Sequence, residues 1–226
     1  MTDLDRLDAV IPTLNAAATL SATLAALPQG ATVIVSDGGS TDTTLDIARA
    51  AGCRIVSGPR GRGRQLAAGA DAATRPWRLF LHADTIVSLQ GWSAIARHMA
   101  RPEGAHVAAS LRLAIDDPAW QARVIERVVA LRVRRFGLAY GDQGLLIHRD
   151  LYAAIGGYAD LSLMEDVEIM RRLGRKRLVV LDGEARTSAA RWRRRGWVGQ
   201  TALNLTCVSL YRFGVPVDRI ARLYGR

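Results

Sequence analysis

The chain has 226 residues, of which 49% are hydrophobic and 6% aromatic, and its formal net charge is +10. This length predicts one domain that buries about 70 to 75% of the surface of its unfolded chain. The low aromatic content predicts a core of Ala, Leu, Val and Ile, which suits helices packed on a parallel sheet. Cys53 and Cys207 lie far apart, which argues against a disulfide-stapled domain or a zinc site and favours the reduced thiols of a cytosolic protein. No charged start with an apolar core precedes Asp8, so we expect no secretion signal.

The positive charge is concentrated in the second half of the chain. Residues 101–226 carry 22 basic and 13 acidic residues, whereas residues 1–100 carry 9 basic and 8 acidic residues. Clustered arginine favours anionic partners such as phosphates, lipid headgroups or nucleic acid.

Strands and helices alternate along the first half of the chain. Apolar runs predict strands at residues 7–12, 32–36, 54–56 and 78–81. Helical patterns lie between them, at residues 15–27, 43–51 and 66–73. We expect Asn15 to cap the first helix and Asp42 to open the second. Consecutive βα units at this spacing predict a doubly wound parallel sheet.

The second half of the chain has a less regular pattern. We expect helices at residues 92–100, 120–136 and 167–173, a helical turn at 150–156, and strands at 107–113, 145–147 and 178–181. The run at 197–213 is largely apolar, but it is short for a membrane span and contains Gln200 and Asn204. We therefore expect it to pack on the domain or to lie at a membrane surface, where the arginines at 191–195 suit an anionic leaflet.

Two of the predicted strands lead into an aspartate, Asp37 after the second and Asp84 after the fourth. Parallel strands of an open α/β sheet bring their carboxyl ends to one edge, where ligands bind. Two glycines follow Asp37 and allow a tight turn beside a ligand. A carboxylate without a charged neighbour, such as Asp84, suggests a metal ion or a hydroxyl-rich ligand. Each aspartate alone is equally consistent with an ordinary turn or cap.

Three arginines, Arg60, Arg62 and Arg64, lie between the third strand and the next helix. Their guanidinium groups and the helix amides are suited to bind a diphosphate together. Leu66 stands where a dinucleotide-binding fingerprint requires glycine, and no P-loop sequence is present. A solvated basic turn is the competing interpretation.

An acidic cluster, Glu165, Asp166 and Glu168, opens the predicted helix at 167–173. The helix dipole alone would explain acidic residues in a first turn. Alternatively, a transfer to an alcohol needs a carboxylate that takes up the hydroxyl proton.

Taken in order, five motifs resemble the family 2 glycosyltransferases: Val10-Ile-Pro-Thr-Leu-Asn15, Ser36-Asp-Gly-Gly-Ser-Thr-Asp42, His82-Ala-Asp84, Gly141-Asp-Gln-Gly144 and Glu165-Asp166. More narrowly, the chain is similar to a bacterial subgroup of small members with His-Ala-Asp in place of Asp-x-Asp. The resemblance implies an α/β chain with a GT-A type fold, in which helices flank a mostly parallel central sheet, and with a basic helical C-terminal region. It also implies a single domain over 1–226, with a nucleotide-binding half at about 1–100 and an acceptor-binding half at about 101–226.

The resemblance also implies roles for individual residues. Asp166 matches the catalytic base, with Glu165 beside it, and Asp84 matches the ligand of Mn²⁺ or Mg²⁺. The donor nucleotide would be bound at Pro12, Thr13, Asn15, Asp37, Gly39, Arg60, Arg62, Arg64, His82, Ala83 and Asp84. The acceptor would be bound at Asp142, Gln143, Arg191 and Trp192. The implied activity is an inverting, metal-dependent sugar transfer of the hexosyltransferase type.

Departures from the family pattern affect the finer expectations. Ala16 and Gly38 stand where many members carry acidic residues, and a UDP-sugar is the favoured donor. His82 either binds the metal or hydrogen-bonds within the sheet. Ser188-Ala-Ala-Arg-Trp192 lacks the glutamine that marks processive synthases, so we expect a non-processive enzyme.

The expected partners are a nucleotide-sugar donor and a small-molecule or lipid-linked acceptor, with contact to an anionic membrane as a further hypothesis. We expect a cytoplasmic protein, peripheral on the inner face of the membrane under that hypothesis. Two alternatives stay open, a non-catalytic relative that binds a nucleotide sugar and a basic nucleic-acid-binding protein. The second predicts stacking aromatics among basic residues, a pattern confined to 192–197, so we expect no nucleic acid. A nucleotidyltransferase would need a lysine-bearing loop after the first strand, which the chain lacks.

Overall fold

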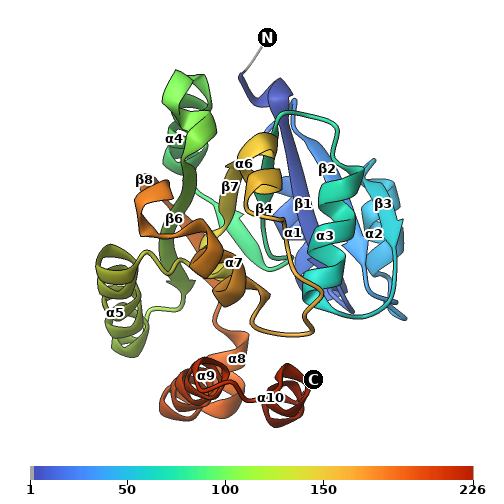
Figure 1. Ribbon diagram of the computed structural model, residues 1–226. Helices are drawn as coiled ribbons and strands as arrows, with labels where there is room; N and C mark the ends of the chain where they lie inside the picture. The colour runs from blue at the N-terminus through green and yellow to red at the C-terminus, as the bar shows by residue number, and fades with distance from the viewer. Residues whose placement is uncertain (1–2, 226) are drawn as a thin grey trace.

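The computed structural model describes residues 3–225, and within them helices cover both faces of one eight-stranded sheet (Figure 1). The strands are β1 (Leu7–Thr13), β2 (Thr32–Asp37), β3 (Arg54–Ser57), β4 (Trp77–Phe80), β5 (Thr85–Val87), β6 (Ala108–Asp116), β7 (Leu145–His148) and β8 (Leu178–Ser188). The helices are α1 (Ala17–Ala25), α2 (Thr44–Ala50), α3 (Arg62–Ala72), α4 (Leu89–Ala100), α5 (Trp120–Phe136), α6 (Arg149–Ala154), α7 (Glu165–Leu173), α8 (Ala190–Arg195), α9 (Trp197–Arg212) and α10 (Val217–Tyr224).

The strand order is β3-β2-β1-β4-β7-β6-β8-β5. The first four strands of this order are parallel, as the βα units predict. The pair β6 and β8 is also parallel, so the expected mostly parallel sheet is present, whereas β7 runs antiparallel to both β4 and β6, and β5 runs antiparallel to β8. The link between β4 and β5 is too short for the crossover that a parallel pair requires, so β5 instead joins the far edge of the sheet.

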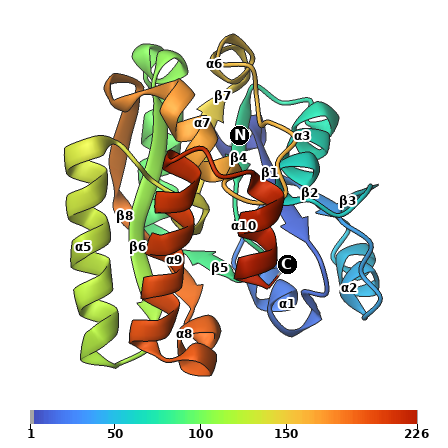
Figure 2. The same ribbon diagram turned by 60° about the horizontal axis from the view of Figure 1, so that its bottom comes forward.

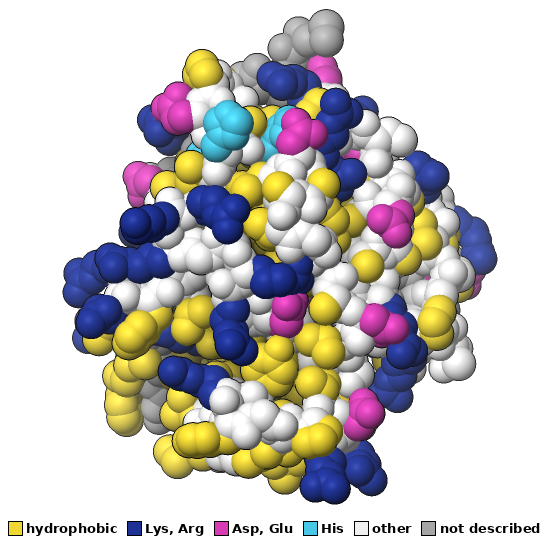
Figure 3. All heavy atoms as spheres, viewed as in Figure 1, with side chains coloured by type: hydrophobic (Ala, Val, Ile, Leu, Met, Phe, Trp, Pro, Cys, Tyr) yellow, Lys and Arg dark blue, Asp and Glu magenta, His cyan; other side chains and the backbone are white. Residues whose placement is uncertain are grey.

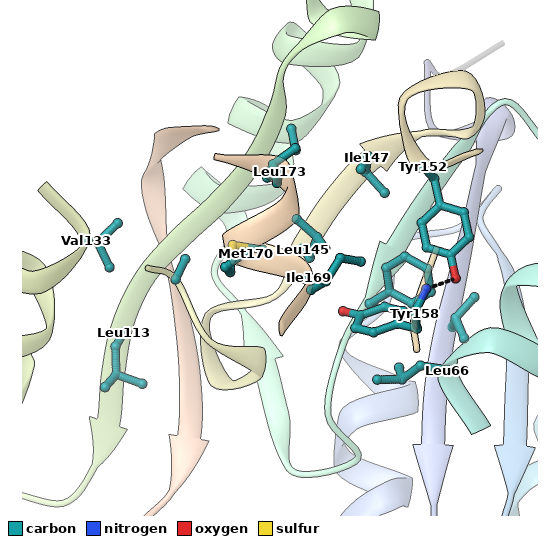
Figure 4. Close-up of a cluster of buried hydrophobic side chains, with 14 of the residues drawn as sticks. Leu66, Leu113, Val133, Leu145, Ile147, Tyr152, Tyr158, Ile169, Met170 and Leu173 are labelled. Carbon is teal, nitrogen blue, oxygen red and sulfur yellow. Dashed lines mark hydrogen bonds between the residues drawn. The ribbon is translucent and has the colours of Figure 1, made fainter. Parts of the chain in front are cut away.

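Both faces of the central strands are buried, which explains their continuous apolar runs. Because side chains alternate along a strand, Val10 enters the core under α3, whereas Ile11 enters the core on the α1 and α4 side. Figure 4 shows part of the first core, where Leu145 of β7 lies near Ile169 and Met170 of α7. These two cores fix the carboxyl edge of the sheet relative to α7.

The C-terminal helices α9 and α10 lie together at one end of the molecule (Figures 1 and 2). They pack on the start of α7 through a third apolar cluster that includes Met164, Val167, Cys207 and Ile220. The helix expected at 197–213 is present as α9, whereas α8, α10 and strand β5 are elements that the sequence did not reveal. Within residues 3–225, no helix combines the length and the apolar character that crossing a bilayer requires.

We expect Gly63→Ala to destabilise the fold, because α3 passes close to the loop before α7. A Cβ atom at Gly63 would lie 2.3 Å from the Ala159 carbonyl oxygen and 2.7 Å from that of Leu161. Such overpacking costs about 1–3 kcal/mol of unfolding free energy, measurable by urea denaturation. Gly58→Ala is the control, because nothing lies within 4 Å of its added Cβ atom. Equal effects of the two substitutions would contradict this account.

Candidate active site

A cavity of about 670 Å³, here called the first cavity, opens at the carboxyl ends of β1 and β4. This is the edge at which open α/β sheets bind ligands. Eight of the residues expected at a donor site line it, namely Pro12, Thr13, Asn15, Arg60, Arg62, His82, Ala83 and Asp84. Three other expected residues, Asp37, Gly39 and Arg64, are not among its lining residues.

Hydrogen bonds that involve side chains join the loops after β1 and β2. Asn15 Oδ1 accepts a hydrogen bond from the Thr41 amide at 2.8 Å, and the Asn15 amide donates to Ser40 Oγ at 2.8 Å. The expected cap role of Asn15 is therefore wrong. Asp42 of the neighbouring loop accepts from the amide of Ala17 at the start of α1 instead. These hydrogen bonds hold Asn15 at the mouth of the first cavity.

Asp37 is buried beneath the second of these loops. Its carboxylate accepts hydrogen bonds from Thr13 Oγ1 at 2.8 Å and from the amides of Gly39 at 2.9 Å and Ser40 at 2.8 Å. Burial alone would raise the pKa of Asp37, but the bonds from Ser40, Thr13 and Gly39 outweigh it, so that the pKa lies below its ordinary value. Gly39 has a φ of 92°, a left-handed conformation that favours glycine. The two residues shape the loop without lining the first cavity.

The three arginines at the start of α3 have different positions. Arg60 is exposed and lines the first cavity together with Gly61 and Arg62, which begin α3. The amides and dipole of a helix N-terminus favour an anion at this place. Arg64 was expected beside them, but it pairs with the exposed Asp160 and lies outside the cavity.

Arg62 connects the first cavity to the acidic start of α7. Its guanidinium forms an ion pair with the buried Glu165 and lies 3.5 Å from Asp166 Oδ2. Burial raises the pKa of Glu165 above its ordinary value, although the charge of Arg62 acts in the opposite direction. Asp166 is more accessible, with 16% of its side chain exposed against 1% for Glu165, and its Oδ2 accepts from the Gly141 amide at 3.1 Å. Of the two carboxylates, Asp166 is therefore the one that a substrate reaches.

Asp84 lies in the turn between β4 and β5, with 20% of its side chain exposed. Arg191 Nη2 lies 3.8 Å from Asp84 Oδ2, and the Ser188 amide donates to the Asp84 carbonyl at 3.2 Å. The antiparallel pairing of β5 with the end of β8 brings these residues together. Between residues 3 and 225, no three His, Cys, Asp or Glu side chains form a metal site by themselves.

A second cavity, of about 480 Å³, lies between α5 and α9. It shares five lining residues with the first, namely Arg62, His82, Asp84, Ser188 and Arg191. Asp142, Asp166 and Trp192 also line it. The expected acceptor residue Gln143 does not, because it is buried and its amide donates to the Leu111 carbonyl at 2.9 Å.

Asp142 is a half-buried acid that lines this second cavity, and its inaccessible Oδ1 atom has no hydrogen-bond donor among the described residues. Burial raises its pKa, with Arg132 opposing the shift and Asp166 adding to it. The indole nitrogen of Trp192 is likewise buried without an acceptor among the described residues. Buried polar atoms without a partner are uncommon in folded proteins, and two of them lie in residues that line this cavity.

Backbone strain occurs at both cavities. Among the residues that the structure describes, only Asn15 and Met164 have a left-handed backbone without being glycine, with φ values of 50° and 66°. Asn15 lines the first cavity, and Met164 lines the second and immediately precedes Glu165. Such strained residues cluster at functional sites.

Sequence reasoning missed part of the first cavity's wall. Ser188 lies at the end of β8, and Asp218 and Arg222 come from α10. Pro216 directly before α10 is a helix-start signal that could have revealed this helix, but its position against the cavity depends on tertiary packing. Arg222 adds a further cation to a wall that already contains Arg60, Arg62 and Arg191.

A family model described as "Glycosyl transferase family 2" matches residues 8–158. The chain belongs to glycosyl transferase family 2. Uncharacterized glycosyltransferases of Mycobacterium tuberculosis and Mycobacterium bovis are 41% identical to it over 81 residues, which is 35% of this chain and 37% of theirs. The match thus spans little more than a third of these curated relatives.

Solved glycosyltransferase structures resemble this glycosyltransferase in fold. TarS (1-349) from S. aureus superposes with a TM-score of 0.62 at 14% identity and covers 96% of this chain and 68% of that chain. Glucosyl-3-phosphoglycerate synthase from Mycobacterium tuberculosis, in complex with Mn²⁺, UDP and phosphoglyceric acid, gives a TM-score of 0.57 at 19% identity and covers 93% and 79%. The predicted GT-A type α/β fold is confirmed.

Proposed function

We propose that this glycosyltransferase moves a sugar from a nucleoside diphosphate sugar, with a UDP-sugar favoured, to a hydroxyl group and inverts the anomeric centre. The observation that carries the proposal is the shared wall of the two cavities, which joins a basic pocket at the sheet edge to Asp166. Family membership supports the donor class. Structures of similar fold in complex with UDP-GlcNAc, and with UDP and Mn²⁺, support the choice of nucleotide.

The donor would occupy the first cavity. Its nucleoside would lie by Pro12 and Asn15, above the loop that Asp37 organises. Its diphosphate would lie at the N-terminus of α3, between Arg60 on one side and Arg222 of α10 on the other. Guanidinium groups bind phosphate oxygens in pairs, so this placement neutralises the donor's charge.

Mn²⁺ or Mg²⁺ is the proposed cofactor. Asp84 would hold the ion together with phosphate oxygens of the donor, because such ions are bound by one or two carboxylates plus substrate phosphates. The residues fit this arrangement, since Asp84 is accessible from both cavities and the neighbouring arginines would bind the donor phosphates that share the ion. In that position the ion would offset the charge that develops on the leaving diphosphate.

Asp166 is the proposed catalytic base. The Gly141 amide donates a hydrogen bond to its Oδ2 atom at 3.1 Å, and the Arg62 guanidinium lies 3.5 Å from the same atom. The acceptor oxygen attacks the anomeric carbon and passes its proton to Asp166, while the bond from that carbon to the diphosphate oxygen breaks. The bonding electron pair leaves with the diphosphate. Glu165, buried under Arg62, would keep the guanidinium in place rather than act on the acceptor.

The proposed acceptor binds in the second cavity, beside Asp142, Arg191 and Trp192. A single sugar is transferred before the product leaves, because the sequence motif at 188–192 lacks the glutamine of processive enzymes. We still predict that the basic segment at 193–195 contacts an anionic membrane, which would place the protein at the inner face of that membrane.

The donor proposal predicts that a nucleotide and a divalent ion stabilise the protein together. A ligand at about 100 times its dissociation constant adds about 2.7 kcal/mol to the free energy of unfolding, which raises the melting temperature by several degrees. We expect one of UDP, GDP, dTDP and CDP to give this shift with Mn²⁺, and a smaller shift without it. Mn²⁺ alone should have little effect, because the described residues hold no three-ligand metal site.

Asp84→Asn and Asp182→Asn form the matched pair for this measurement. Asp84 should be required for the joint effect, whereas Asp182 lies outside the first cavity and is exposed, so its substitution should preserve the shift. No shift with any nucleotide, together with salt-sensitive binding to RNA or DNA, would overturn the donor proposal in favour of nucleic-acid binding.

A further inference from the structure

The second cavity has apolar walls on two sides. From α5 it is lined by Val124, Ile125, Val128, Val129 and Phe136, and from α9 by Leu205 and Val208. Asp84 lines both cavities. Asp166 lines the second cavity, next to the part that the two cavities share. The cavity therefore combines an apolar region with a reactive polar end.

These apolar side chains are unusually accessible. Val128 is 60% exposed, Phe136 59% and Leu205 64%. The three lie on the helix faces that border the cavity, and Figure 3 shows apolar side chains gathered over α5 and α9, at its lower left and bottom. Large exposed apolar patches mark binding sites, and the apolar side chains here line the same cavity as Asp166.

Cations accompany the apolar walls. Arg132 and the exposed Arg212 line the second cavity, and the Arg132 guanidinium lies 3.8 Å from the centre of the Tyr140 ring. Figure 3 shows further basic side chains among the apolar ones in this region. A molecule that fits both the apolar walls and the arginines has an apolar chain and an anionic group.

We propose that the acceptor is an anionic amphiphile, a lipid-type molecule whose apolar chain lies between α5 and α9 and whose hydroxyl group faces Asp166. This inference rests on the proposed sugar transfer and names the class of its acceptor. The anionic group lies at Arg132 and Arg212, which both line the second cavity. The size of the cavity, about 480 Å³, is within the range of about 300–1,000 Å³ typical of small-molecule sites.

Dodecyl phosphate, kept below its micelle concentration, is the probe that tests this inference by titration calorimetry. We expect it to bind the wild-type chain, and Val128→Asp and Leu205→Asp each to weaken binding about tenfold or more, because a charge would meet the apolar chain. Leu131→Asp and Val198→Asp are the matched controls, since both residues are exposed apolar positions on the same two helices outside the cavity. The controls should retain the wild-type affinity within about twofold.

Two further arms distinguish the possible results. Inorganic phosphate should bind much more weakly than dodecyl phosphate, and equal affinity would overturn the proposal by showing an anion site without a chain site. Equal losses in lining and control variants, or no binding by the wild type, would also overturn it. The nucleotide shift with Mn²⁺ should persist in Val128→Asp and Leu205→Asp, so a failed acceptor proposal is separable from a failed donor proposal. That shift also reports whether each variant is folded.

Discussion

Asp166→Asn should lower the rate of sugar transfer by about 10²–10⁴-fold, the usual contribution of a general base. Asparagine has the shape of aspartate and still accepts a hydrogen bond from the Gly141 amide, but it cannot take up the acceptor's proton. Binding of the nucleotide with Mn²⁺ should be preserved, because Asp166 lines the second cavity and not the first. The measurement is single-turnover transfer from the radiolabelled donor that the nucleotide screen selects, with the melting shift as the binding readout.

The control for this prediction is Asp160→Asn, which removes an exposed carboxylate that pairs with Arg64 outside both cavities. It should leave the transfer rate nearly unchanged. Equal activity of Asp166→Asn and the wild type would contradict the base assignment. A wild-type chain that binds the donor but transfers nothing would instead favour the non-catalytic relative that the sequence left open.

The first half of the fold was predictable because its signals are local. Apolar runs such as residues 32–36 and the glycines after Asp37 specify a strand and a turn without reference to distant residues. Parallel βα units then assemble in a regular order, so the edge that carries Asn15 and Asp84 follows from the pattern.

The other half depends on long-range pairing that a local pattern does not contain. Strand β5 has three residues, and β8 extends seven residues beyond the strand expected at 178–181. Their pairing places Arg191 near Asp84, two residues more than one hundred positions apart. The sequence identified both residues, but only the fold shows that the proposed acceptor residue Arg191 lies beside the proposed metal ligand Asp84.

Residue type alone did not predict the directions of the side chains. Arg60, Arg62 and Arg64 are equivalent in the sequence, yet helix geometry directs Arg64 to Asp160 and Arg62 to the buried Glu165. Similarly, Asp142 lines the second cavity, whereas the next residue, Gln143, points into the sheet and bonds the backbone of Leu111.

Arg62→Met should destabilise the protein by about 3–5 kcal/mol, because it leaves Glu165 as a buried carboxylate without its cation. This loss of unfolding free energy should depend on pH. Burial already raises the pKa of Glu165, and loss of Arg62 removes the opposing effect, so the folded-state pKa rises further above the unfolded one. A group of this kind favours folding at low pH, and its contribution is lost as the pH rises through the folded-state pKa. Denaturant unfolding should therefore show a smaller penalty at about pH 5 than at about pH 8.

Arg64→Met is the matched control, because it removes a neighbouring ion pair whose side chains are 50% and 65% exposed. Such surface pairs contribute about 0–1 kcal/mol. Adding Glu165→Gln to Arg62→Met should recover much of the lost stability and abolish its pH dependence, since no buried charge then remains in the pair. If the single and double variants were equally unstable at both pH values, the arginine would stabilise the fold by packing rather than by charge. The ion pair would then not be what holds α3 and α7 together between the two cavities.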